Sequence, residues 1–254
     1  MRKYFIIICI SVTAFVLHFG QAKDAHALKG FEVGARGYYW DGSLDATMQT
    51  NNDPEIDLKN DLNIGDEGSN AGEIYLRWGR NHFTLAYTST SYTGSSTNSV
   101  VFNGVTFTGV IDSQLEYDQI DGIYQYDLIK YNPVIATFNL GILLQVKFVD
   151  GFAQLEESLT STVEREEFSA PIPMIGLGGG IGVVNNTVVL EARVAGLEYS
   201  GNRAIDFQGM VGFNPVPFLK IFGGYKIFDL KVDEDGFKID YTIDGPFAGV
   251  QLSF

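Results

Sequence analysis

From Phe31 onward, apolar side chains recur at every second position, and this period of two constrains the fold more than any other feature. Successive side chains of a β-strand point to opposite faces, so such a pattern predicts strands with one apolar face. The rows lie at Phe31–Tyr39, Ile74–Trp78, Phe83–Tyr87, Ile120–Leu128, Phe138–Phe148, Ile175–Val183, Val188–Val194, Ile205–Phe213, Leu219–Tyr225 and Pro246–Phe254. We therefore expect an all-β fold of ten antiparallel strands, although eight or twelve would fit the same pattern.

Three turn sequences predict how these strands pair. Asn and Gly tolerate the positive φ angles of two-residue hairpins, and such pairs occur at Asn103-Gly104, Asn185-Asn186 and Asp235-Gly236. Each hairpin then sets apolar residues opposite one another, as in Phe83 with Tyr124, Ile181 with Leu190, and Ile221 with Val250. A shift of one residue would invert every face, so this agreement favours the assigned registers.

Four basic residues of the strands, Lys147, Arg193, Lys220 and Lys226, alternate with the apolar residues and so point to the opposite face of the sheet. Each would cost about 2–4 kcal/mol on a lipid-facing surface at mid-bilayer. Aromatic residues also gather at one end of the rows, as Phe31, Trp78, Phe83, Phe213, Phe218 and Phe254. A soluble β-sandwich alternates too, but the charge-free rows and the aromatic girdle favour a transmembrane barrel with a charged lumen.

Connection lengths alternate around the expected barrel. Short links lie near Gly79–Asn81, Ile129–Pro133, Asn185-Asn186 and Asn214–Pro217, whereas longer ones lie at Leu44–Ala71, Thr88–Glu116, Asp150–Ser169, Ser200–Arg203 and Phe228–Asp244. This asymmetry is typical of an up-and-down barrel with short turns at one end and loops at the other. In the last hairpin the polarity reverses, so we expect Lys231–Asp240 and Asp233–Lys238 pairs facing water on an extracellular extension. The hairpin through Asn103-Gly104 does likewise, so we expect the extension to be an ordered sheet with a small apolar core.

The first 27 residues have the pattern of a secretory signal peptide. Met1-Arg2-Lys3 is basic, Phe5–Phe19 is apolar, and Ala25-His26-Ala27 matches a cleavage site. An uncleaved anchor is the alternative, but a run of 15 residues is shorter than the ~20 needed for a membrane-spanning helix. We therefore expect a cleaved signal peptide over residues 1–27 and a single barrel over residues 28–254.

The alternating apolar residues at the C-terminus resemble a known sequence signal. Val250, Leu252 and Phe254, within Gly249–Phe254, are similar to the C-terminal signal of bacterial outer-membrane β-barrel proteins. The resemblance implies a location in the Gram-negative outer membrane, recognition by the barrel-assembly machinery, and contact with outer-membrane lipid and lipopolysaccharide. It identifies no subfamily, and the oligomeric state stays open.

The candidate site residues are the charged residues at the strand positions that alternate with the apolar rows. We call these positions the lumen parity, because their side chains are expected to point into the lumen. The residues are Glu32, Arg36, Glu73, Arg77, Asp121, Asp127, Lys147, Glu191, Arg193, Asp206, Lys220 and Lys226. Side chains of opposite charge in a narrow barrel form ion pairs that fill the lumen, since an unpaired buried charge is costly. Open channels are found in larger barrels, of ~16–18 strands. We therefore expect a largely plugged lumen and a structural or surface-interaction role. A narrow porin-like channel for small solutes is the alternative.

Composition excludes several other functions. The chain has 17 basic and 31 acidic residues, a net charge of −14, which disfavours a nucleic-acid partner. Its one cysteine, Cys9, and two of its three histidines lie in the leader, leaving His82 beside a short turn. We expect no catalytic, cofactor-binding or metal site. An enzyme at the outer rim, working by carboxylates alone, is a third hypothesis.

The Leu44–Ala71 connection is acidic. Asp53 and Pro54 suit the N-cap and first position of a short helix through about Ile64. Its acidic residues are Asp53, Glu55, Asp57, Asp61, Asp66 and Glu67. A solvated loop is favoured over a divalent-cation site near lipopolysaccharide, since the spacing does not match a dedicated calcium loop.

Overall fold

The computed structural model describes residues 31–50, 53–133, 136–184, 186–234 and 236–254. Within these ranges no helix has the length and hydropathy to cross a bilayer. Ten long strands build the main sheet: β1 (Phe31–Thr50), β3 (Glu67–Trp78), β4 (Asn81–Ser96), β7 (Ile111–Tyr131), β8 (Ala136–Glu157), β9 (Thr162–Val183), β10 (Val188–Tyr199), β11 (Asn202–Val216), β12 (Leu219–Glu234) and β13 (Phe237–Ser253). The connections hold three short strands: β2 (Ile56–Asp57), β5 (Val100–Phe102) and β6 (Val105–Phe107).

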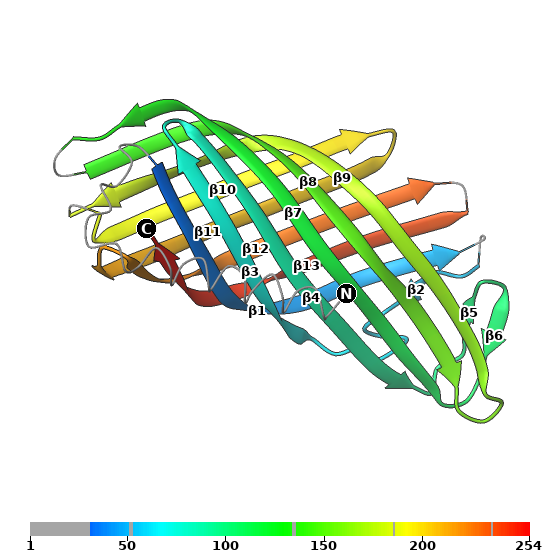
Figure 1. The fold of residues 1–254 in the computed structure, drawn as a ribbon. Helices are drawn as coiled ribbons and strands as arrows, with labels where there is room; N and C mark the ends of the chain where they lie inside the picture. Colours follow the sequence, from blue (N-terminus) through cyan, green and yellow to red (C-terminus); the bar gives the residue numbers. More distant parts are fainter. Residues whose placement is uncertain (1–30, 51–52, 134–135, 185, 235) are drawn as a thin grey trace.

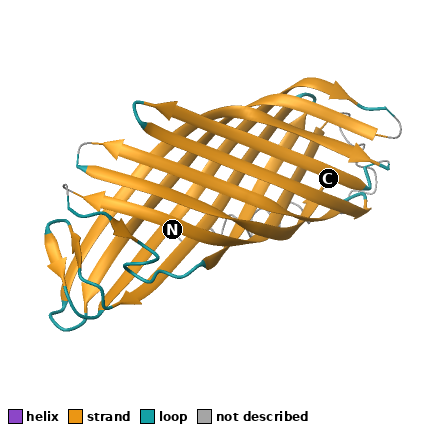
Figure 2. Ribbon diagram, turned by 180° about the vertical axis from the view of Figure 1, so that it is seen from behind, coloured by secondary structure: helices purple, strands orange, loops and turns teal. Residues whose placement is uncertain are grey.

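The ten long strands form a closed antiparallel barrel (Figures 1 and 2). Each long strand pairs with the next in chain order, and β13 pairs with β1 to complete the circle, with Gly37 facing Val250. The prediction of a ten-stranded up-and-down barrel is confirmed. A sandwich of two packed sheets is excluded, because one continuous sheet closes on itself.

The predicted registers are confirmed at all three hairpins. Phe83 faces Tyr124, Ile181 faces Leu190, and Ile221 faces Val250. The turn residues Asn103, Asn186 and Gly236 adopt φ angles of 51°, 60° and 83°, as two-residue hairpins require. Asn185 and Asp235, the first residues of two of these turns, lie outside the described residues, as does the predicted signal peptide.

Several of the strands are longer than their apolar rows. Residues 88–96 and 111–116 are paired strand, as expected for a hairpin through Asn103-Gly104 that continues past the apolar rows. Residues 150–157 and 162–169, expected to be part of a connection, are paired strand as well, with Glu157 facing Ile111 on one side and Thr162 on the other. The apolar side chains change parity here, so the lipid-facing pattern ends while the ladder continues. The expected outward pairs are present, with Lys231–Asp240 at 3.4 Å and Lys238–Asp233 at 3.9 Å. The barrel therefore has an extension beyond its apolar belt.

The helix predicted from Asp53 is wrong. Ile56 pairs with Met48 of β1, and the chain continues through turns to Ile64. Ile56 and Ile64, like Leu58 and Leu62 between them, are buried inside the barrel. This segment gains more by burying four apolar side chains against the barrel wall than by forming a short solvent-exposed helix, so tertiary packing overrides the capping signal.

Strand β9 has one long free edge. Its ladder with β10 ends at Ile175–Gly196, and in the described structure residues 162–174 pair with β8 alone. Pro171 and Pro173 lack the N–H that a further pairing with β10 requires, which explains this end point. The edge beyond them is charged, with Glu164, Arg165, Glu166 and Glu167, and such residues discourage pairing with another chain.

Candidate functional site: the closed lumen

The outer surface of the barrel is a broad apolar belt. Leu85, Leu144, Val211 and Ile221 project from its middle and are about half exposed. At the end with the short turns, Phe31, Trp78, Phe83, Phe213, Phe218 and Phe254 are exposed as well. An apolar surface this extensive is stable only against lipid, with aromatic rings at the interface between hydrocarbon and water.

The structure places the charged residues of the lumen parity inside the barrel. Asp121, Asp127, Lys147, Asp206, Lys220 and Lys226 are nearly inaccessible, as are Glu73 and Arg36, while Glu32, Arg77, Glu191 and Arg193 are partly accessible. This set holds six basic and six acidic side chains, so their formal charges balance. The barrel brings most of them together in two ion clusters at different heights.

The first cluster is centred on Lys147 of β8. Its ammonium lies 2.9 Å from Asp121 of β7 and 2.8 Å from Asp206 of β11. The side-chain amide of Gln145 donates to both carboxylates, at 3.3 and 3.2 Å, and Lys147 also lies 4.5 Å from the ring centre of Phe228. A group from β8 therefore joins β7 and β11 across the interior, and the lumen is filled at this level.

The second cluster shares two carboxylates among four cations. Glu191 lies 2.7 Å from Lys220, 3.4 Å from Arg36 and 3.7 Å from Arg77. The other carboxylate, Glu73, accepts a hydrogen bond from Arg193 at 3.0 Å and lies 3.5 Å from Arg36. Arg36 of β1 thus reaches from β3 to β10, which ties opposite sides of the barrel together.

Neutral and aromatic side chains, which the charge pattern of the sequence does not single out, complete the interior. Tyr75 donates to Glu32 at 3.0 Å and accepts from Gln251 at 2.7 Å, and Lys226 lies 4.7 Å from a ring centre of Trp40. These residues lie at the same alternating, lumen-facing positions as the charged ones. Their position in the alternation is therefore the sequence signal that predicts them.

His82 lies at the short-turn end, beside the turn where its position in the sequence placed it. Its Nε2 is 2.8 Å from a carboxylate oxygen of Asp127. The other oxygen of that carboxylate accepts hydrogen bonds from Gln125 at 2.9 Å and Asn139 at 3.1 Å. All four groups hold one another in place across β4, β7 and β8.

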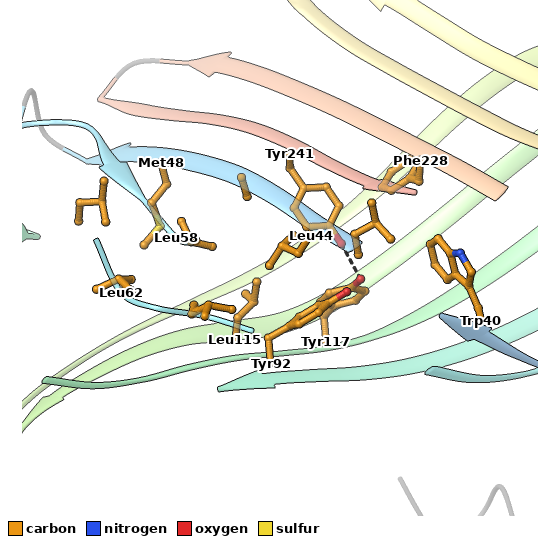
Figure 3. Close-up of a cluster of buried hydrophobic side chains, with 14 of the residues drawn as sticks. Trp40, Leu44, Met48, Leu58, Leu62, Tyr92, Leu115, Tyr117, Phe228 and Tyr241 are labelled. Carbon is orange, nitrogen blue, oxygen red and sulfur yellow. Dashed lines mark hydrogen bonds between the residues drawn. The ribbon is translucent and has the colours of Figure 1, made fainter. Parts of the chain in front are cut away.

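The extended end of the barrel is closed by an apolar core (Figure 3). Leu44 and Met48 of β1 pack with Tyr92, Leu115 and other buried side chains. The hydroxyls of Tyr117 and Tyr241 meet inside this core at 2.5 Å, joining β7 to β13. This packed apolar core is separate from the ion clusters and holds no continuous water.

The hairpin of β5 and β6 lies over the extended end as a lid. Phe102 and Phe107 are fully buried in the apolar core. Its tip is fastened by three hydrogen bonds: the Asn103 N–H donates to Thr50 Oγ1 at 3.0 Å, the Gly104 N–H to Asp53 at 2.8 Å, and the Asn103 side chain to Glu166 at 3.2 Å. Asp53, expected to cap a helix, instead holds the lid.

The short-turn end, in contrast, is hollow. A cavity of about 720 Å³ opens between the short turns and reaches inward to Arg36, Arg193 and Met210. Gly180 and Gly182 form part of its β9 wall, at positions that face the lumen. The lumen is therefore a pouch with one open end. Across the described part of the chain, no group of His, Cys, Asp and Glu residues is arranged to hold a metal ion.

Comparisons with known proteins find similarity only in structure. No family model and no curated protein matches the sequence. Three similar solved structures are the attachment invasion locus protein Ail of Yersinia pestis (12% identity, TM-score 0.32), Neisserial surface protein A (15%, 0.32) and the toluene transporter TodX of P. putida (9%, 0.32). Each match covers 89% of this chain, and 99%, 97% and 90% of the other chain, respectively.

The class of the protein rests on its own geometry. A closed antiparallel barrel of ten strands, apolar outside, polar within and with exposed aromatic residues at one end, is a transmembrane β-barrel.

Proposed function

We propose that this protein is an outer-membrane barrel with a closed, non-conducting lumen and a structural or surface-interaction role. The observation that carries the proposal is the double closure of the lumen. Ion clusters around Lys147 and Glu191 fill the middle, and the apolar core beneath the β5–β6 hairpin fills the extended end. A solute would have to displace both to pass.

The proposed orientation puts the short turns in the periplasm and the extension outside the cell. Short periplasmic turns and longer extracellular segments are the rule for such barrels. The signal peptide over residues 1–27 would direct export, and Val250, Leu252 and Phe254 would be read by the assembly machinery. Outer-membrane lipid and lipopolysaccharide would surround the apolar belt.

The extension is the part of the molecule available for surface contacts. Its outer face is acidic, and like charges face each other across strands at Asp118–Asp150 and Asp112–Glu156. Such pairs destabilise a sheet slightly, so this face is not optimised for stability. A projecting sheet with an acidic outer face fits an interaction role better than a transport role.

A narrow channel for small solutes is the second candidate. The cavity of about 720 Å³ favours it, because the barrel is open from the short-turn end as far inward as Arg36, Arg193 and Met210. A catalytic role gains less support: His82 is bound to Asp127 at the short-turn end, and not at the outer rim. The absence of enzymatic activity stays a prediction.

Planar-bilayer recordings of the purified, refolded protein test the proposal directly. We expect no conductance steps, in a chamber where a known open porin added afterwards does conduct. Stable open steps from this protein alone would overturn the closed-lumen function and establish the channel.

A further inference from the structure

We infer that the cavity at the short-turn end binds a small hydroxylated carboxylate that enters from the periplasmic side. The inference goes beyond a structural or surface role, and it does not require the lumen to conduct. It rests on a pair of facing residues, Arg36 of β1 and Gln251 of β13, which are direct cross-strand partners. Both side chains line the cavity, and both are at least nine-tenths buried.

Arg36 is an incompletely bound guanidinium. Its contacts with Glu191 and Glu73 are long, at 3.4 and 3.5 Å, whereas a charge-assisted hydrogen bond is typically about 2.7–2.9 Å. A third contact, from Nη1, reaches only the sulfur of Met210 at 4.0 Å. The Nε of Arg36 has no hydrogen-bond partner in the described structure. A buried donor of this kind favours an anionic acceptor.

Within the described ranges, Gln251 has an unpaired hydrogen-bond acceptor, whereas Arg36 has an unpaired donor. Its amide nitrogen donates to Tyr75 at 2.7 Å, but its buried Oε1 has no donor among the described residues. Leaving such an acceptor unpaired costs free energy, so a ligand hydroxyl at this position would be favourable. One wall of the cavity therefore presents an anion-binding donor and a hydroxyl-binding acceptor on adjacent strands.

The charge of the cavity agrees with an anionic ligand. Five basic side chains line it: Arg36, Arg77, Lys130, Arg193 and Lys220. Three carboxylates, Glu32, Asp127 and Glu191, also line it. Glu73, which is outside the lining, also contacts Arg36 and Arg193, so five basic side chains here face four carboxylate side chains, whereas the chain as a whole has a net charge of −14. A carboxylate that enters the pouch would complete the partial ion pairs of Arg36 and Arg77.

The ligand class follows from these requirements together. The guanidinium needs a carboxylate, Gln251 needs a hydroxyl donor, and a volume of about 720 Å³ admits a small molecule. Gluconate has both groups, whereas glucose lacks the carboxylate and acetate lacks the hydroxyls. Comparing these three compounds therefore tests carboxylate binding by Arg36 separately from hydroxyl binding by Gln251.

The test is isothermal titration calorimetry of the full-length barrel in detergent, at low and constant ionic strength. We expect gluconate to bind more tightly than acetate, and glucose not to bind. Arg36→Gln should weaken gluconate binding about tenfold or more, as expected for loss of a hydrogen bond between charged groups. Retained gel mobility of the unheated, folded barrel would show that this variant still folds.

A second variant tests the site without altering the ion clusters. Thr84 of β4 lines the cavity, so Thr84→Trp should fill it and abolish binding. Ser91→Trp, on the exposed outer face of the same strand, should bind as the wild type does. The inference is overturned if gluconate does not bind, if glucose binds equally well, or if neither Arg36→Gln nor Thr84→Trp weakens binding. A conducting barrel would overturn the proposed function alone.

Discussion

At the scale of single residues, burial decides how much a charge matters. Lys147 and Lys231 each face carboxylates across the sheet, but Lys147 is fully buried between two of them and Lys231 is half exposed to solvent. Removing one partner of a buried ion pair leaves an uncompensated charge inside the protein, whereas an exposed pair is replaced by water.

Lys147→Met should therefore destabilise the barrel by about 3–5 kcal/mol, because Asp121 and Asp206 lose their shared cation. Lys231→Met, which breaks the surface pair with Asp240, should cost about 0–1 kcal/mol. Urea unfolding of both variants, followed by loss of the folded band on unheated gels, measures the difference. Equal midpoints for the two would show that the buried cluster contributes no stability.

At the scale of strands, glycines decide how closely neighbouring backbones approach. Gly223 and Gly224 are consecutive on β12 and point to opposite faces of the sheet. A Cβ on Gly224 would lie 2.1 Å from the carbonyl oxygen of Gly209 and 2.6 Å from the ring of Phe247. A Cβ on Gly223 would meet nothing nearer than 3.5 Å.

Gly224→Ala should accordingly destabilise the barrel by about 1–3 kcal/mol through overpacking, since backbone must move to admit the methyl group. Gly223→Ala, one residue away on the lipid face, is the matched control and should leave stability nearly unchanged. Thermal unfolding of the two proteins in the same detergent compares them. A reversed order would mean that β12 can shift at Gly224 without cost.

The connection between β1 and β3 is held by two carboxylates with lowered pKa values. Backbone N–H donation from Asn60, with further hydrogen bonds from its side chain and from Lys59, holds the pKa of Asp57 below its usual value. Although partial burial opposes it, hydrogen bonds from Lys59, Leu44 and Ser43 likewise lower the pKa of Asp66.

A carboxyl group whose pKa is lowered by folding stabilises the folded state at every pH above its pKa in the unfolded chain. This stabilisation is lost as the pH falls through the pKa of the group in the folded state. Residues 53–66 should therefore stay docked at pH 7 and pH 5 and loosen below about pH 4, near the usual pKa of an aspartate. Hydrogen exchange of this segment, corrected for the intrinsic effect of pH, measures the change. Asp66→Asn should loosen it already at pH 7. Unchanged protection at pH 3 would contradict the assignment.

At the scale of the whole molecule, the proposed closure of the lumen consists of two barriers in series. Deleting the lid, residues 99–108, should disturb the apolar core and leave the ion clusters around Lys147 and Glu191 in place. We therefore expect bilayer recordings of this variant to stay silent, as for the intact protein. Open steps in the variant alone would show that the lid is the sole barrier, and that the ion clusters leak.

Assembly is also a property of the whole chain, because β13 must pair with both β12 and β1 to close the barrel. Phe254→Ala should reduce the amount of folded barrel recovered from the outer membrane, as the proposed assembly signal loses its aromatic residue. Ser253→Ala, on the opposite face, should not. Cell fractionation with heat-shifted gel mobility reports both, and equal yields would argue against a role for Phe254.

The sequence alone determined the apolar rows of the strands, their registers at three hairpins and their two faces. Period-two alternation and hairpin turns are local, so Ile181 opposite Leu190 and Lys147 on the lumen face followed from position in the chain. Even the extension was signalled locally, at Lys231 and Asp233, by the reversal of polarity.

Tertiary structure alone decided which lumen residues meet and where the lumen closes. Arg36 reaches Glu191 over a separation of 155 residues, and the tip of the β5–β6 hairpin binds Asp53, which local pattern assigned to a helix cap. Alternation gives the face of each side chain but not the shear and curvature of the closed barrel, which set the distances across its interior. The cavity beside Gly180 and the Nε of Arg36, which has no hydrogen-bond partner among the described residues, depend on those distances, so they are visible only in the folded molecule.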